Sequence, residues 1–173
     1  MPLIAKPRAD EHHEYFGRYI ALVGDDAFTA LAGQAASTPQ RLQGMTESQA
    51  MHRYAPDKWS VKDAIQHMAD VERVFAYRAL RFARADSTEL PGFDENAWAP
   101  AAGADRRSAS ELLFELAAVR AATLTLFAGL DHEALLRRGR ANGAETSVRA
   151  IAHIIAGHER HHLAVLKDKY QVG

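Results

Sequence analysis

Apolar residues recur at steps of three and four along residues 61–85, and this spacing constrains the fold more than any other feature. It places the side chains on one face of an α-helix. The residues on this face are Val61, Ala64, Met68, Val71, Phe75, Ala79 and Phe82. A long helix with one apolar face is typical of a helical bundle, and no alternation of β-branched residues competes with it. The sequence therefore predicts an all-α fold.

Capping residues mark the starts of the other expected helices. Ser60, with Asp63 three residues later, resembles a capping box before the helix of residues 61–85. Similar signals predict helices from Asp25-Asp26 to about Gly44, from Ser108 or Ser110 to about Gly129, and from Ser147 to about Tyr170. A short helix with an aromatic face is expected over residues 10–23. Pro39 should kink or break the helix in which it lies.

The remaining segments are expected to be turns and loops. Residues 87–107 contain Pro91, Gly92, Pro100 and Gly103, which predict a long connection. A connection of this length is often a lid over a site, and its Asp94 could then orient a metal-bound water. The alternative is a solvated crossover loop. Residues 131–136 and 139–143 are expected to form a short turn and a loop.

Composition excludes several classes of function. The chain has 173 residues, no cysteine, and a net charge of −1 from 21 basic and 22 acidic residues. Without cysteine it cannot supply a thiolate nucleophile or an iron–sulfur cluster. The even charge balance gives no reason to expect nucleic-acid binding. Residues 1–8 lack the pattern of a signal peptide, and no window is apolar enough to span a membrane, so we expect a cytoplasmic protein.

Four of the nine histidines lie on the last expected helix, at His153, His158, His161 and His162. With about 100° of rotation per residue, the apolar face of this helix is centred near His158. His162 lies about 40° away, inside the face, whereas His161 lies about 60° away, at its edge. His153 falls on the polar side.

His158 and His162 are therefore neighbours one turn apart, both expected to point inward. This spacing lets two imidazoles bind one ion, and a metal would satisfy nitrogens that are otherwise costly to bury. The alternative is a pair of core histidines held by hydrogen bonds. His67 lies at the edge of the stripe on the helix of residues 61–85, where it can face a neighbouring helix.

Three other residues have two interpretations each. Glu72 falls within the apolar stripe, so it is either functional or paired with Arg149, Arg78 or Arg120. Arg149 and Arg160 flank the histidine face, where they would hold a carboxylate substrate or be solvated. Trp59 is expected to fill the core at a helix start.

Three segments carry a resemblance to a known family: Tyr54–Asp63 leading to His67 and Arg73, Leu90–Asp94, and Ala141–His162. The combination of Trp-Ser, a following acid and His67 with a late His-x-x-x-His resembles the DinB-like (YfiT-like) superfamily over about residues 10–170. The resemblance implies a divalent metal held by His67, His158 and His162. Whether His161 replaces or supplements His162 stays open.

The resemblance also sharpens the expected fold and function. We expect a single domain over residues 1–173, an up-down-down-up four-helix bundle with a long crossover loop and a short N-terminal helix. The metal is expected to be zinc or nickel, with iron as a further candidate. The leading functional hypothesis is transfer of a group to a low-molecular-weight thiol. This thiol must come from a separate small molecule, because the chain has no cysteine. The alternatives are a metal-dependent hydrolase at the same site and a non-enzymatic, metal-stabilised bundle. A homodimer is also expected.

Overall fold

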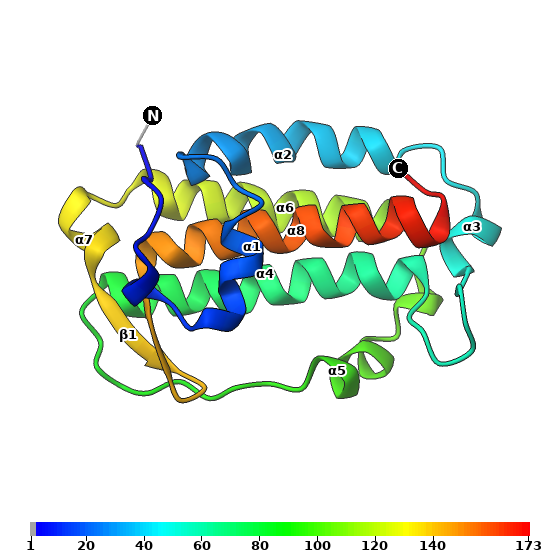
Figure 1. Cartoon of the computed structure of the whole chain (residues 1–173). Helices are drawn as coiled ribbons and strands as arrows, with labels where there is room; N and C mark the ends of the chain where they lie inside the picture. The colour runs from blue at the N-terminus through cyan, green and yellow to red at the C-terminus, as the bar shows by residue number, and fades with distance from the viewer. Residues whose placement is uncertain (1–2) are drawn as a thin grey trace.

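A computed structural model describes residues 3–173 and is helical over most of that length (Figure 1). The α-helices are α1 (Gly17–Ile20), α2 (Ala27–Leu42), α3 (Glu47–Met51), α4 (Val61–Ala83), α5 (Glu95–Ala102), α6 (Ala109–Ala128), α7 (His132–Leu136) and α8 (Val148–Tyr170). Three 3-10 helices are η1 (Ala9–Glu11), η2 (Glu14–Phe16) and η3 (Ala104–Arg106). Met1 and Pro2, part of the segment in which we expected no signal peptide, lie outside the described residues.

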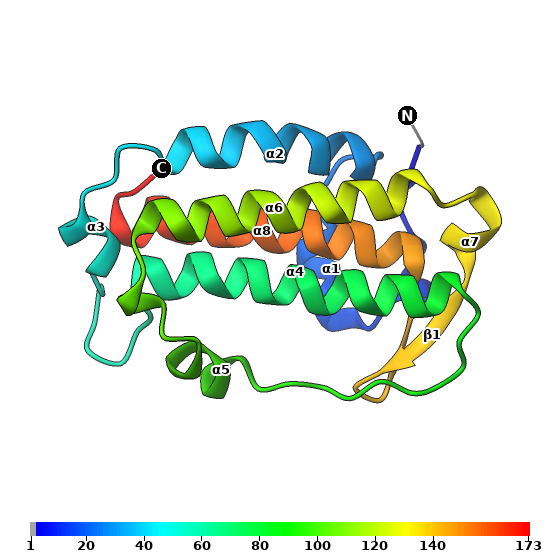
Figure 2. The ribbon, with the colours of Figure 1, turned by 180° about the vertical axis from the view of Figure 1, so that it is seen from behind.

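Four long helices form the body of the molecule. α4 packs against α6 and α8, and α2 covers the same two helices from the opposite side. The colours of Figure 1 show α2 and α8 running in one direction and α4 and α6 in the other, and Figure 2 shows the same bundle from behind. The segment between α4 and α6 returns along the length of the bundle and carries α5 and η3.

The caps lie where the sequence places them. The Ser60 hydroxyl accepts a bond from the Asp63 backbone N–H, and the Asp63 carboxylate accepts one from the Ser60 N–H, so the capping box at α4 is confirmed. Ser147 caps α8 in the same way by accepting from the Ala150 N–H. Ser108, rather than Ser110, caps α6. These caps satisfy backbone donors that have no partner inside the helix.

Residues 139–143 are not only a loop, which corrects our expectation. They belong to an antiparallel hairpin of β1 (Arg138–Ala141) and β2 (Ala144–Ser147). The two residues between the strands, Asn142 and Gly143, have φ angles of 52° and 75°. Asn-Gly is a strong hairpin signal because both residues tolerate positive φ. The signal was missed because the flanking strands are only four residues long and lack alternating apolar residues.

Other local expectations were wrong in detail. Pro39, which we expected to kink or break its helix, does not break it, because α2 continues through this residue to Leu42. Pro39 lies in the last turn, where the helix loses one hydrogen bond, and the buried side chains of Thr38 and Leu42 hold the turn against the bundle. Residues 10–23 form η1, η2 and α1 instead of one helix, and residues 87–107 contain α5 and η3.

α1 lies directly against α8 because Gly157 has no side chain. A Cβ atom at Gly157 would lie 2.0 Å from the Tyr19 carbonyl oxygen. Only glycine allows this approach between a helix and a neighbouring backbone. The contact brings Tyr19 next to His158, the residue after Gly157.

Among the described residues, none of the helices combines the length and apolarity required to cross a bilayer.

Candidate metal centre

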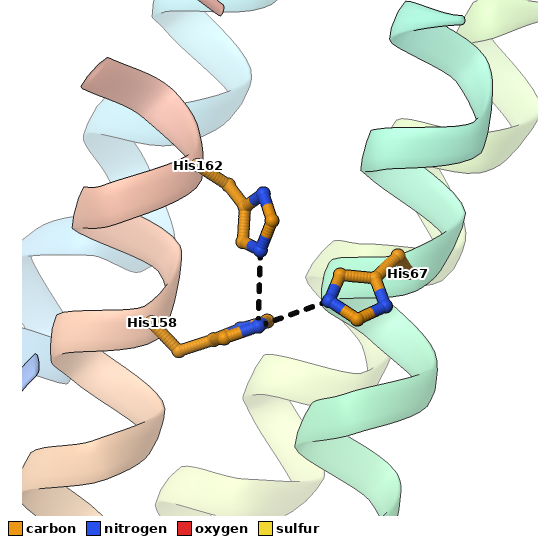
Figure 3. A group of neighbouring side chains, drawn as sticks. All are labelled: His67, His158 and His162. Carbon is orange, nitrogen blue, oxygen red and sulfur yellow. Dashed lines mark hydrogen bonds between the residues drawn. The ribbon is translucent and has the colours of Figure 1, made fainter. Parts of the chain in front are cut away.

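The structure brings together the three histidines that the sequence singles out. His67 comes from α4, and His158 and His162 come from consecutive turns of α8 (Figure 3). The Nε2 atom of His158 lies 3.0 Å from that of His67 and 3.1 Å from that of His162. One ligand atom from each ring lies within 4.8 Å of the other two, a grouping that can hold a metal ion.

Burial keeps these imidazoles neutral. His67 and His158 are 8% and 7% exposed, and His162 is partly buried. Burial lowers the pKa of His67 to about 4. Burial, with smaller contributions from His67 and His161, lowers the pKa of His162 to about 3. The pKa of His158 is also held well below its usual value by burial. All three rings are therefore uncharged at neutral pH, and each keeps one nitrogen lone pair that can bind a metal.

Hydrogen bonds alone do not satisfy this arrangement. A neutral imidazole carries one N–H and one lone pair, in opposite directions on its two nitrogens. The Nε2 atom of His158 faces two other Nε2 atoms, so it can donate to only one of them, or accept with its single lone pair. A cation placed among the three would accept all three lone pairs at once. The donor set, three imidazole nitrogens, suits zinc, nickel and iron.

Among the remaining histidines of α8, the structure confirms one expectation and corrects another. His161 lies beside the cluster, with its ring 5.5 Å from that of Tyr19, and is not part of the three-residue group. His153 was expected on the polar side of the helix but is fully buried. α8 is central in the bundle and is buried on all sides from Ala150 to Glu159, so the expected polar side does not reach solvent there.

The three histidines open onto a cavity of about 530 Å³. Its larger apolar side chains come from helices α4 and α8, the N-terminal segment and the segment before α5, and the hairpin adds two alanines. These apolar residues are Phe16, Val71, Phe75, Phe82, Phe93, Ile151 and Ile154. The polar lining includes His13, Arg18, Tyr19, Arg78, Glu95, Asn142 and Thr146. A cavity of this size accommodates a small molecule beside the histidines.

Two aromatic residues border the histidines. The Trp59 ring lies 4.6 Å from that of His67, so this tryptophan lines the cavity and is not the core plug that we expected. The Tyr19 ring packs edge-on against His158 at 5.4 Å. Burial raises the pKa of Tyr19 to about 12, although its hydroxyl accepts a bond from Arg18. The sequence indicated the aromatic face containing Tyr19 but not its place at the site.

Glu72 belongs to a buried ion-pair network. Both of its carboxylate oxygens accept from Arg120 at 2.8 Å, and Arg120 also donates to Glu159 at 2.6 Å. Thr38 donates to the second oxygen of Glu159. The network joins α2, α4, α6 and α8, and Glu72 does not line the cavity. Of the two interpretations of Glu72, the structure shows the ion pair, with Arg120 as the partner.

Asp94 also lies away from the histidines. Its side chain caps α5 by accepting from the backbone N–H groups of Asn96 and Ala97. Its neighbours Phe93 and Glu95 line the cavity, but Asp94 does not. This position does not place its carboxylate where it would orient a water at the histidines.

Arg149 and Arg160 are engaged elsewhere. Arg149 binds the buried Glu11 of η1, and Arg160 donates to the Leu22 carbonyl. Neither lines the cavity, whereas Arg18 and Arg78 do, although we did not expect either of them at the site. Arg78 lies on α4 eleven residues after His67, and this spacing was the available signal, since 11 residues complete about three helical turns.

Comparison with known proteins places the chain in a family. The sequence model of the DinB superfamily matches residues 30–166. The chain belongs to the DinB superfamily. The match covers α4, α6 and most of α2 and α8, and it includes the three clustered histidines. No curated protein matches this member of the superfamily.

The fold also resembles that of a solved structure. YfiT from Bacillus subtilis is described as a probable metal-dependent hydrolase with an unusual four-helix bundle topology. The two chains superpose with a TM-score of 0.73 and 20% sequence identity, over 96% of this chain and 91% of YfiT. At this identity the likeness shows a shared four-helix-bundle fold.

Proposed function

We propose that this protein is a metal-dependent enzyme that acts on a small molecule, with one divalent ion held by His67, His158 and His162. The observation that carries the proposal is the convergence of three neutral imidazole nitrogens at the wall of a cavity of about 530 Å³. A purely structural ion needs no cavity beside it, so this arrangement favours an enzyme over a metal-stabilised bundle. Zinc or nickel fits the donor set best, and iron is the further candidate.

The ion would supply a Lewis acid that lowers the pKa of a coordinated thiol or water. The chain's own residues would do the rest. All three histidines line the cavity, so an ion held by them would be accessible to a substrate bound there. Trp59 and Tyr19 border the histidines with aromatic rings, which limits the approach of water from α1 and from the start of α4.

Transfer of a group to a small thiol is the reaction that we propose first. The chain has no cysteine, so the sulfur would enter with a cosubstrate. In the cavity wall, the carboxylate of Glu95 is exposed and is the only acidic group among the described lining residues. A thiol needs less help from a general base than water does, because its pKa is lower. Metal-dependent hydrolysis is the second candidate, favoured by the likeness to the fold of YfiT.

A panel of model substrates separates the two reactions. The metal-loaded protein is mixed with 1-chloro-2,4-dinitrobenzene and with 4-nitrophenyl acetate, each with and without a small thiol such as cysteamine. The proposal predicts metal-dependent turnover only when the thiol is present. Metal-dependent ester hydrolysis without thiol would favour the second candidate, and absence of turnover with all pairs would contradict activity on these classes of substrate.

Two neighbouring histidines provide a matched pair of variants. His162→Ala removes one proposed ligand and should abolish metal-dependent turnover. His161→Ala removes an imidazole from the adjacent position, outside the three-residue group, and should retain most of it. Equal losses in both variants would contradict the assignment of His162. The proposal also includes an up-down-down-up order of the helices, a cytoplasmic location and a homodimer. Light scattering measures the oligomeric state.

A further inference from the structure

Arg78 is a buried cation without an acidic partner in the described part of the chain. Its side chain lines the cavity, and the residue is only 7% exposed. One guanidinium nitrogen, Nη2, donates to the Pro91 carbonyl oxygen at 2.9 Å. The guanidinium carbon lies 5.1 Å from the centre of the Phe75 ring and 5.8 Å from that of Phe93. One carbonyl and two aromatic faces leave most of its five N–H donors unused.

The other buried arginine of the bundle shows the contrast. Arg120 is 2% exposed and pairs with two carboxylates, Glu72 and Glu159. Burying a guanidinium without such a partner is costly, because the charge loses its hydration. Among residues 3–173, no carboxylate lies within ion-pair distance of Arg78, and Glu95, the acidic group of the cavity lining, does not pair with it. An anion from outside the chain would supply the missing partner.

The position of Arg78 relative to the histidines is set by α4. Arg78 follows His67 by 11 residues, which corresponds to about three turns and about 16 Å along the helix axis. The two side chains therefore lie on the same face. Helical side chains lean toward the N-terminus, and the guanidinium of Arg78 accordingly lies over Phe75, one turn closer to His67.

The wall between the two ends is apolar. Val71 and Phe75 lie between His67 and Arg78 on the cavity-facing side of α4. Ile151 and Ile154 line the cavity from α8, in the turns that precede His158. Along α4, the cavity wall thus runs from a histidine end at His67, through an apolar stretch, to the guanidinium of Arg78.

We propose that Arg78 binds the carboxylate of an elongated substrate whose apolar body fills the middle of the cavity and whose reactive end reaches the three histidines. A guanidinium recognises a carboxylate through two parallel N–H···O bonds, and this planar geometry is the reason for assigning a carboxylate to it. The part of this proposal that concerns the reactive end of the substrate, at the three histidines, rests on the function proposed above. The binding of the carboxylate by Arg78 does not need the metal.

The proposal is tested with octanoate on the full-length, metal-free protein. The absence of metal prevents the carboxylate from binding to an ion at the histidines. Isothermal titration calorimetry compares octanoate with 1-octanol, which has the same apolar chain and no charge. We expect the wild-type protein to bind octanoate more tightly than 1-octanol. Arg78→Gln should lower the affinity for octanoate by about tenfold to a hundredfold, the range for a charge-assisted hydrogen-bonded pair. It should leave the affinity for 1-octanol unchanged.

Three further variants make the result specific. Arg84→Gln removes the same charge from an exposed residue directly after α4 and should leave octanoate binding unchanged. Arg18→Gln removes the other arginine of the cavity, near the histidine end, and should weaken octanoate by less than Arg78→Gln. Arg78→Lys keeps the charge without the planar pair of donors, so it should retain part of the preference and serves if Arg78→Gln does not fold.

Three outcomes would overturn the proposal. The first is equal binding of octanoate and 1-octanol by the wild-type protein, and the second is a larger loss of octanoate binding in Arg18→Gln than in Arg78→Gln. The third is unchanged octanoate binding in folded Arg78→Gln, or in Arg78→Lys if the glutamine variant does not fold. A zinc titration of Arg78→Gln separates this inference from the metal site. That variant should bind one equivalent of zinc, which is also the amount that we expect the wild-type protein to bind. If neither protein binds zinc, the proposed function fails while the assignment of the carboxylate to Arg78 is decided by the octanoate results alone.

Discussion

The Nε2 atoms of His67 and His158 lie 3.0 Å apart although the two residues are separated by 91 positions in the sequence. Their meeting depends on the packing of α4 against α8, since each side chain is carried by a regular helix (Figure 3). Sites built on helices hold their geometry better than sites built on loops. The integrity of the site is therefore tied to the contacts that fix these two helices and the short α1 beside them.

Gly157→Ala should separate α1 from α8 next to the three histidines. The new methyl group would lie 2.0 Å from the Tyr19 carbonyl oxygen, so α1 must move away from α8. Forced displacement of packed backbone costs about 1–3 kcal/mol in stability. We expect that loss in the free energy of unfolding, measured by urea denaturation, together with a change in the environment of Tyr19 in near-ultraviolet circular dichroism.

Gly33→Ala is the matched control for that experiment. Gly33 lies inside α2, and no atom lies within 4 Å of a Cβ built there. Alanine should therefore stabilise α2 by about 0.5–1 kcal/mol, because it lowers the entropy of the unfolded chain. If Gly157→Ala were as stable as Gly33→Ala, the close approach of α1 to α8 would be wrong.

Removal of Arg120 should be strongly destabilising. Arg120→Met leaves Glu72 and Glu159 buried without their shared cation, and losing one partner of a buried ion pair costs about 3–5 kcal/mol. Thermal unfolding followed by circular dichroism measures the effect. Arg73→Met removes a more exposed arginine that pairs with Glu115, and should cost less than about 1 kcal/mol. Similar small losses in both variants would show that the buried network contributes little to stability.

The sequence predicted the long helices well because each has a local signature. α4 follows an apolar stripe and begins at a capping box, and both signals depend only on residues near one another in the chain. The inward direction of His158 and His162 follows from the same periodicity. The partner of Glu72 could not be chosen among three arginines, because that choice depends on which helices are neighbours.

The parts that the sequence did not predict depend on packing between distant segments. The burial of His153 requires knowing that α8 is covered on every side. The place of Tyr19 depends on Gly157, 138 residues later in the chain. Arg78 was considered only as a partner for Glu72, since its position in the cavity wall emerges once α8 and the segment before α5 are in place.

The contacts of Glu11 with Arg149 and Ser147, at the start of α8, should make the free energy of unfolding depend on pH. Burial alone would raise the pKa of Glu11, but hydrogen bonds from Arg149 and Ser147 outweigh it and lower the pKa from 4.5 to about 2. Because the folded protein binds the Glu11 proton less readily than the unfolded chain does, this stabilisation is present above about pH 4.5. It is lost as the pH falls toward 2.

Glu11→Gln isolates this contribution. We expect the variant to be less stable than the wild-type protein by about 1–3 kcal/mol at pH 6, with a difference that shrinks as the pH falls toward 2. Urea denaturation at several pH values measures it. Glu14→Gln changes an exposed residue of the same segment and should follow the wild-type curve. A difference that stays constant between pH 6 and pH 2 would show that the charge of Glu11 is not responsible.

Metal content tests the central claim most directly. The protein is purified without added metal, reconstituted separately with zinc and with nickel, dialysed, and analysed for metals by mass spectrometry. We predict about one equivalent per chain for the wild-type protein and for His161→Ala, and a small fraction of an equivalent for folded His67→Ala, His158→Ala and His162→Ala. A wild-type protein that binds neither metal, or a His162→Ala variant that binds as much as wild type, would contradict the three-histidine site.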